Sequence, residues 1–281
     1  MFKLTSRKKN YIFDRPAIMG ILNVTPDSFS DGGRYDEMDK ALLHCEQMLA
    51  EGADIIDIGG CSTRPNNAIA TENEEMQRVV PIMKAIRKAF PEALVSIDTF
   101  RKNIAEACIE EGADIINDIS GGLFDVEMLP YIGENHIPYV MMHCVGTPAT
   151  MHQYTLVGDI HQTVMDFFAQ QHKTLEAYGD QQIILDPGIG FGKSLEANYQ
   201  LLNDLERYRY NNLPILIGIS RKSLIFKVLG TTPQGAENGT TVLNTIALLN
   251  GADILRVHDV KNAREAIELV GTFHQSIGKT L

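Results

Sequence analysis

The stretch Glu51-Gly-Ala-Asp-Ile-Ile-Asp57 is repeated almost unchanged as Glu111-Gly-Ala-Asp-Ile-Ile-Asn117, and a third variant reads Asn250-Gly-Ala-Asp-Ile-Leu-Arg256. In each copy a helical pattern ends at the glycine, where a left-handed residue is easiest, and a short apolar strand begins. The first two copies start 60 residues apart, which suits two successive strand–helix units of roughly 30 residues each. The repeat therefore predicts a chain that alternates strands and helices.

Eight short apolar runs fit the strands of such a chain. They are Ala17–Leu22, Asp54–Ile58, Leu94–Ile97, Asp114–Ile116, Pro138–Met142, Ile183–Leu185, Ile215–Gly218 and Asp253–Val257. Because these runs are continuously apolar and do not alternate with polar residues, they indicate parallel strands that are buried on both faces.

Apolar residues at three- and four-residue spacing predict helices after nearly all of these strands. The clearest are Met38–Ala50, Glu72–Ala89, Lys102–Glu110, Val157–Tyr178, Leu195–Arg207, Thr241–Leu249 and Ala263–Thr272. The helical signal is weakest after the fourth strand. We therefore predict a single-domain α/β fold, a (β/α)8 TIM barrel over residues 17–281 with a short N-terminal extension over residues 1–16.

The charge and the cysteines bear on partners and location. The 281 residues include 25 Lys and Arg against 36 Asp and Glu, a formal net charge of −11, which argues against a nucleic-acid partner. No apolar run reaches the roughly 18 residues of a membrane span, and the apolar stretch near the N-terminus is too short for a signal peptide. The 4 cysteines form no CxxC pair, which is typical of reduced thiols. We expect a cytoplasmic protein with neither nucleic-acid nor membrane partners.

Polar residues follow every predicted strand, at the end where the active sites of such barrels lie. In chain order they are Asn23, Asp57, Asp98, Asn117 with Asp118, His143, Asp186, Ser220 with Arg221 and Lys222, and Arg256 with His258. Any one of them alone could be a helix cap or a satisfied loop residue. A full ring of donors and acceptors at one mouth instead predicts a site that binds a flat, hydrogen-bonding heterocycle and an anion.

Two clusters refine this prediction. The basic residues lie after the seventh and eighth strands, where barrel phosphate sites are frequent, so a phosphorylated substrate is expected; a solvated basic patch is the alternative. Asp186-Pro-Gly-Ile-Gly-Phe-Gly-Lys-Ser194 ends like a P-loop, but Pro187 stands where that motif requires glycine. Its glycines are better explained by a sharp turn of the backbone past a ligand held by Asp186, although a merely flexible loop stays open. No histidine spacing indicates a zinc site.

Five motifs in this order resemble the dihydropteroate synthase family. They are Asn23-Val-Thr-Pro-Asp-Ser-Phe-Ser-Asp-Gly-Gly33, Ser62-Thr-Arg-Pro65, Asp186-Pro-Gly-Ile-Gly-Phe-Gly-Lys193, Ser220-Arg-Lys-Ser223 and Arg256-Val-His-Asp259. The resemblance implies a sulfonamide-target enzyme of folate biosynthesis. In its reaction p-aminobenzoate displaces diphosphate from 6-hydroxymethyl-7,8-dihydropterin diphosphate, giving 7,8-dihydropteroate. It also implies a dissociative mechanism, Mg2+ as cofactor and a homodimer.

The same resemblance assigns roles to individual residues. Asp98, Asn117, Met141, Asp186, Phe191 and Lys222 are expected at the pterin, and Phe29, Ser62, Thr63, Arg64, Pro65 and Ser220 at p-aminobenzoate. Asn23, Thr63, Arg256 and His258 are expected at the diphosphate, with Asn23 also at Mg2+. Asp31, Arg64 and Lys222 are expected to be catalytic, with Asp31 near the developing pterin cation. The sequence departs from the family at Cys61 and Asn66, which flank the second loop and bear on its closure.

Two alternatives stay open. Another pterin-binding barrel, such as a methyltetrahydrofolate:corrinoid methyltransferase, would share the pterin carboxylates but would not need Ser62–Pro65 or Ser220–Ser223. A non-catalytic pterin-binding paralogue would be expected to have lost Asn23, Arg64 or Lys222, and all three are present.

Overall fold

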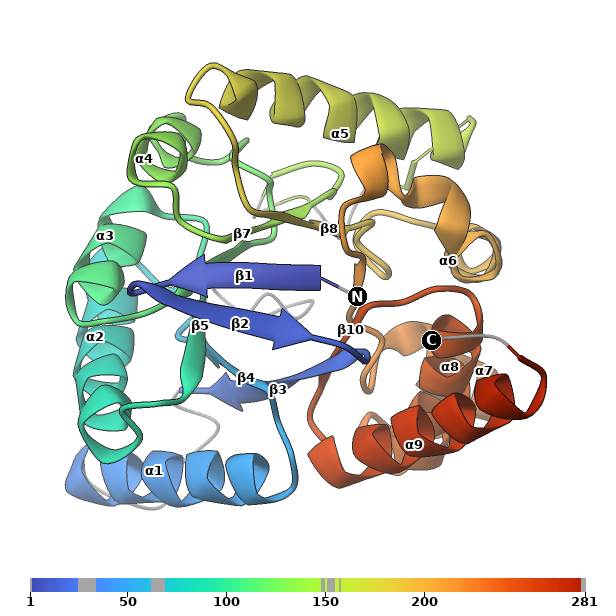
Figure 1. Ribbon diagram of the computed structural model, residues 1–281, viewed down its shortest axis with the longest axis horizontal. Coiled ribbons are helices and arrows are strands. Elements are labelled where there is room, and N and C mark those ends of the chain that lie inside the picture. Colours follow the sequence, from blue (N-terminus) through green and yellow to red (C-terminus); the bar gives the residue numbers. More distant parts are fainter. Residues whose placement is uncertain are drawn as a thin grey trace.

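The computed structural model describes residues 2–24, 34–61, 69–147, 150, 155–156 and 158–278, with only the backbone for 34–36. Eight parallel strands surround a common axis in the order β8-β7-β6-β5-β4-β3-β10-β9 (Figure 1). Their bounds are β3 Ala17–Asn23, β4 Ile55–Gly59, β5 Leu94–Asp98, β6 Ile115–Asp118, β7 Tyr139–Met142, β8 Ile183–Asp186, β9 Leu216–Ile217 and β10 Ile254–Val257. Leu185 N donates to Pro214 O at 2.8 Å, which joins the two ends of the sheet. The predicted (β/α)8 barrel is confirmed.

Helices cover the outside of the barrel. They are α1 Arg34–Ala50, α2 Glu72–Ala89, α3 Lys102–Glu110, α4 Met128–Asn135, α5 Ile160–Glu176, α6 Leu195–Asn203, α7 Ser223–Leu229, α8 Glu237–Leu249 and α9 Val260–Ser276. The sequence does not predict α4 because it has only eight residues, among them Pro130 and Gly133. The helix predicted over Leu195–Arg207 is split, with a 3-10 turn at Leu205–Tyr208. Within the described ranges, no helix is both long and apolar enough to cross a membrane.

The N-terminal extension forms an antiparallel hairpin of β1 Phe2–Ser6 and β2 Lys9–Phe13. Figure 1 shows it lying across the end of the barrel. Leu4 and Phe13 are buried there against the first inward-pointing residues of the strands, such as Met19 and Ile254. The hairpin therefore closes the amino-terminal end of the barrel with apolar side chains, which leaves the opposite end as the mouth.

The aspartate of each Gly-Ala-Asp copy binds the neighbouring strand and an arginine. Asp54 accepts from Ile18 N, Asp114 from Val95 N and Asp253 from Ile215 N, at 2.8, 2.9 and 2.8 Å. Their arginine partners are Arg15 and Arg264 for Asp54, Arg7 and Arg87 for Asp114, and Arg209 for Asp253. The repeat thus provides three similar polar clamps at the hairpin end of the barrel.

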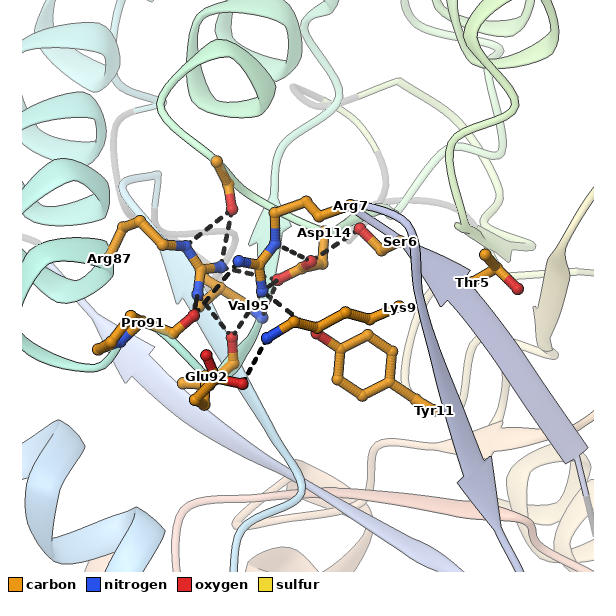
Figure 2. Close-up of polar contacts among 12 residues, drawn as sticks. Thr5, Ser6, Arg7, Lys9, Tyr11, Arg87, Pro91, Glu92, Val95 and Asp114 are labelled. Carbon is orange, nitrogen blue, oxygen red and sulfur yellow. Dashed lines mark hydrogen bonds and ion pairs between the residues drawn. The ribbon is translucent and has the colours of Figure 1, made fainter.

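Figure 2 shows the clamp around Asp114, which also fixes the hairpin. Arg7 Nε lies 2.6 Å from Asp114 Oδ1, and Ser6 Oγ donates to the same oxygen at 2.7 Å. Arg87, from α2, donates to Asp114 Oδ2 at 2.8 Å and to the carbonyl of Gly112. Because the carboxylate of Asp114 is fully buried, its charge depends on these partners.

We expect Asp114→Ala to lower the free energy of unfolding by about 3 kcal/mol or more, since the substitution removes the carboxylate partner of two arginines and the acceptor of the Val95 amide. Urea denaturation followed by circular dichroism measures the loss. Glu92→Ala is the control, because it removes an exposed carboxylate bonded to Lys9 and should hardly move the midpoint. Equal losses for the two variants would contradict the role of the clamp.

Candidate active site

The alternation of side chains along each strand places a polar layer above the apolar one. Strand side chains alternate between faces, so the residue two positions after each inward-pointing apolar residue also points into the barrel. These residues form a second layer, nearer the mouth. The polar members of this set are Asp57, Ser96, Asn117, Asp186 and Arg256. The carboxyl end of the barrel interior is therefore lined with donors and acceptors, as the sequence predicts.

Arg256 lies at the centre of this layer. Its Nε donates to Asp57 Oδ2 at 2.7 Å and its Nη2 to Asp98 Oδ2 at 2.5 Å. Asn117 Nδ2 donates to the same oxygen of Asp57 at 3.1 Å. Burial disfavours the charged form of Arg256, but the two carboxylates outweigh it and raise the pKa of the guanidinium. One cation thus holds two carboxylates from neighbouring strands inside the barrel.

Burial raises the pKa values of the two carboxylates at the mouth. Burial raises the pKa of Asp98 to about 7, against the opposing effect of Arg256. Burial also raises the pKa of Asp186, whose Oδ1 accepts from Gly188 N at 2.7 Å. Both groups gain from N–H donors, because hydrogen bonds to the ionised form favour it.

Lys222 faces Asp186 across the loop that follows β8. Its Nζ donates to Ile189 O at 2.6 Å and lies 4.6 Å from the centroid of the Phe191 ring. Burial lowers the pKa of Lys222 to about 8, with Asp186 acting in the opposite direction. Gly190 adopts a φ of +86°, and a Cβ there would lie 3.1 Å from the Lys222 side chain. The glycine is therefore needed for the close approach of loop and lysine.

Ser220 and His258 meet at the ends of the seventh and eighth strands of the barrel. Ser220 Oγ is 2.9 Å from His258 Nδ1, and His258 N donates to Ser220 Oγ at 3.2 Å. Arg221 instead forms an ion pair with Asp259, with 2.5 Å between Nη2 and Oδ1. Arg221 is therefore held in an ion pair away from the site. Of the neighbouring residues Arg221 and Lys222, it is Lys222 whose charge interacts with Asp186.

The prediction for Met141 is corrected by the structure. Met141 shares the outer face of β7 with Tyr139 and is buried in the core between strands and helices. Met142 points the other way and packs with Phe100, Ile119 and, in part, Phe191. Met142, and not Met141, therefore faces the barrel interior, because a shift of one residue exchanges the faces of a strand.

Two strand-end residues differ from what their position alone suggests. Asp118 lies outside the polar layer, where its carboxylate accepts from Ser120 and from Tyr139 OH at 2.7 Å each. Asp57 was given no role by the family resemblance, yet it is fully buried and bonded to Arg256. Its signal in the sequence is a charged residue that follows two isoleucines in a buried strand.

The structure brings Asp98, Asn117, Asp186, Phe191, Lys222 and Arg256 into one cluster, with Ser220 and His258 paired nearby and Asn23 at the end of β3. Phe29, Asp31, Ser62, Thr63, Arg64 and Pro65 lie outside the described residues. In the described part of the chain, no group of three or more His, Cys, Asp or Glu side chains could hold a metal ion.

Comparisons with known proteins agree with this geometry. Residues 19–258 match the family model described as pterin binding enzyme. Dihydropteroate synthase of Escherichia coli strain K12 is 41% identical over 270 residues, which is 95% of each chain. The Synechocystis enzyme is 43% identical over 250 residues, covering 88% of this chain and 86% of the relative.

Solved structures agree as well. A Yersinia pestis dihydropteroate synthase in a sulfonamide complex superposes with a TM-score of 0.90 at 39% identity, covering 98% of this chain and 100% of that one. A Burkholderia cenocepacia dihydropteroate synthase complexed with 7,8-dihydropteroate gives 0.87 at 34% identity, covering 98% of both. The chain therefore belongs to the family of pterin-binding enzymes and, within it, to the dihydropteroate synthases.

Proposed function

We propose that the mouth of the barrel joins 6-hydroxymethyl-7,8-dihydropterin diphosphate to p-aminobenzoate, releasing diphosphate and 7,8-dihydropteroate, the reaction of folate biosynthesis that gives this enzyme family its name. The observation that carries the proposal is the polar layer around Arg256. It combines buried acceptors and one lysine donor within a single apolar-walled interior. Such an arrangement suits a flat heterocycle with several N–H groups.

Both hydrogen-bond acceptors and a hydrogen-bond donor of the protein bind the pterin. The carboxylates of Asp98 and Asp186 accept from the N–H groups of its aminopyrimidinone ring, and the amide of Asn117 contributes a further polar partner. Lys222 donates to the acceptors of the ring. Met142, in place of Met141, and Phe191 form apolar walls beside it.

The leaving group is stabilised by fixed positive charge. Arg256 uses Nε and Nη2 to hold two carboxylates, and no described residue accepts from its Nη1, which remains for an oxygen of the diphosphate. His258 and Lys222 lie at the same mouth. Early cleavage of the pterin methylene–oxygen bond places negative charge on the diphosphate, and preorganised donors lower the free energy of that transition state.

Mg2+ fits the residues at the end of β3. This ion commonly takes one or two protein oxygens together with substrate phosphate oxygens and water, so it needs no acidic cage. Asn23 would supply one amide oxygen, and Gly59 leaves the space beside it open, because a Cβ there would lie 3.7 Å from Asn23 Oδ1 and 3.4 Å from Asp98 Cβ. When bound, Mg2+ would neutralise charge on the diphosphate.

The p-aminobenzoate site rests mainly on the sequence. We propose that Phe29, Ser62, Thr63, Arg64 and Pro65 surround p-aminobenzoate, with Thr63 also reaching the diphosphate, and that Asp31 lies near the pterin cation. Ser220 is proposed to meet the carboxylate of p-aminobenzoate, for which it would exchange its bond with His258. Arg64 and Asp31, with Lys222, are the proposed catalytic residues. The cytoplasmic location stays a prediction from the sequence.

A homodimer is proposed through helices α7, α8 and α9, of which α8 contacts the other two, and all three expose apolar side chains. These are Val228 and Leu229 on α7, Val242, Ile246 and Leu249 on α8, and Leu269, Phe273 and Ile277 on or directly after α9. On α8 and α9 they recur at three- or four-residue spacing, so each helix presents an apolar stripe. A second copy of the chain would cover this surface in a two-fold arrangement.

The proposed activity is tested with purified protein supplied with the pterin diphosphate, p-aminobenzoate and Mg2+, with dihydropteroate and diphosphate measured as products. No product would refute the proposal. Lys222→Met should lower turnover by about a hundredfold or more, because it removes a charged donor at the reacting centre. Lys227→Met, an exposed lysine of α7, should leave turnover unchanged.

Pterin affinity should be highest above about pH 7 and should fall as the pH is lowered. The reason is the raised pKa of Asp98, about 7, since protonation removes the charge that the N–H groups of the ring stabilise. Fluorescence titration with a pterin across this range measures the effect. Asp98→Asn should bind more weakly but with a flatter pH dependence. A wild-type affinity that is constant through pH 7 would contradict the assignment.

Leu269→Glu should convert a dimer into a monomer, because Leu269 is 71% exposed on the apolar face and a charge there opposes burial. Light scattering coupled to size-exclusion chromatography reports the mass in solution. Ile12→Glu is the matched control, since Ile12 is 73% exposed but lies on the hairpin. A dimer that survives Leu269→Glu and dissociates with Ile12→Glu would refute the proposed interface.

A further inference from the structure

Lys193 carries a buried ammonium that has no part in the proposed reaction. Its Nζ lies 2.8 Å from Gly188 O and 3.2 Å from Phe191 O. The same atom lies 3.1 Å from His143 Nδ1 and 3.3 Å from His143 O. None of these acceptors has a formal charge, because burial lowers the pKa of His143 to about 3. Burial lowers the pKa of Lys193 to about 7, against the opposing effect of the Asp186 carboxylate. Holding an ammonium at this place is therefore costly, and its retention calls for a reason.

Lys193 holds together two loops at the mouth. Residues 187–192, which we call the β8 arch, turn back from the end of β8 and press against the residues that follow β7. A Cβ on Gly188 would lie 1.8 Å from His143 O, and one on Gly192 would lie 2.5 Å from Val145 Cβ. Both glycines also have positive φ values of +71° and +63°. The β8 arch therefore has one tightly fitted path, and the ammonium bonds it to His143 along that path.

The carbonyl groups of the β8 arch point in two directions. Those of Gly188 and Phe191 accept from the ammonium of Lys193. The carbonyl of Ile189, between them, accepts from Lys222. The ring of Phe191 lies against the same Lys222 ammonium. The position of the Lys222 ammonium thus depends on the β8 arch, and other carbonyl groups of the same arch bind Lys193.

We propose that Lys193 is a positioning residue for pterin binding: by tying the β8 arch to His143, it places the Ile189 carbonyl and the Phe191 ring that orient Lys222. Lys193 itself does not touch the substrate in this arrangement. Asn198 supports the apex of the same arch, since its Oδ1 accepts from Gly190 N at 2.7 Å. The inference rests on the proposed function, because it assigns Lys222 and Phe191 to the pterin.

The test compares pterin binding with p-aminobenzoate utilisation in Lys193→Met, which keeps a long apolar side chain but has no donor. Binding of 6-hydroxymethylpterin is followed by its fluorescence, in a chain that contains no tryptophan. We expect the Kd for the pterin and the KM for the pterin diphosphate to rise about tenfold, as for the loss of a charged hydrogen-bond donor. The KM for p-aminobenzoate should change by less than about twofold.

Two controls separate positioning from general destabilisation. Lys84→Met removes a lysine whose side chain is 70% exposed and should leave both substrates unaffected. Ile86→Val makes a small cavity in the buried face of α2, next to Arg87 and the Asp114 clamp at the hairpin end of the barrel, and lowers stability away from the arch. If Ile86→Val weakens pterin binding as much as Lys193→Met does, the role of Lys193 is only structural and the inference fails.

A double-variant cycle with Phe191→Ala tests the route of the effect. If Lys193 acts through the β8 arch, Lys193→Met and Phe191→Ala weaken pterin binding by the same route. The double variant should then have the same Kd for pterin as whichever single variant binds it less tightly. Additive losses would overturn the inference. Should Lys193→Met not fold, Lys193→Gln is measured in its place; it keeps two N–H donors but loses the charge, so we expect a smaller rise in the Kd for the pterin, again with an unchanged KM for p-aminobenzoate. Wild-type protein that binds no pterin refutes the proposed function, whereas equal binding by wild type and variant refutes only this inference.

Discussion

The ion pairs of Arg256 with Asp57 and Asp98 are the interaction on which the interior of the barrel depends. They connect β10 to β4 and β5 across the mouth. Asp57 is fully buried, so without the guanidinium its charge would be uncompensated in the core, a large destabilisation. The guanidinium of Arg256 thus permits two carboxylates inside the barrel. One of them, Asp98, lies at the mouth, where we propose that it meets the ligand. Stability and function are therefore coupled in this layer.

The strands divide these tasks between their two ends. At the hairpin end, Asp54, Asp114 and Asp253 are each satisfied by a backbone amide and an arginine, so they act in folding. At the mouth, the carboxylates of Asp98 and Asp186 have raised pKa values because burial exceeds the compensation they receive. A buried carboxylate whose desolvation is only partly offset by hydrogen bonds gains more from the N–H donors of a ligand than one whose oxygens already have their partners. This difference separates the acidic residues that stabilise the barrel at one end from those at the other end that we propose to bind substrate.

The sequence predicted the eight strands because burial on both faces makes them continuously apolar. It also predicted that the polar strand-end residues of the described chain lie at one mouth, because parallel strands end together. It could not predict which of Met141 and Met142 faces inward, since this depends on where regular pairing stops. The partners of Arg256 were also out of reach, because Asp57 lies 199 residues away and meets it only when the barrel closes. Helix α4 was missed because eight residues give too short a periodic signal.

The repeat that indicates the barrel also builds the centre of its site. Each copy ends on an inward-pointing polar residue: Asp57 in the first, Asn117 in the second and Arg256 in the third. Asn117 Nδ2 and Arg256 Nε both donate to Asp57 Oδ2, at 3.1 and 2.7 Å, so the three copies converge on one oxygen atom. The residues that precede this last position are nearly identical, because every copy ends a helix, begins a strand and provides the aspartate of a clamp. The last residue is different in every copy, and the differences supply an acceptor, an amide and a cation. Divergence at this position thus gives similar strands three different polar groups in the layer that we propose as the binding site.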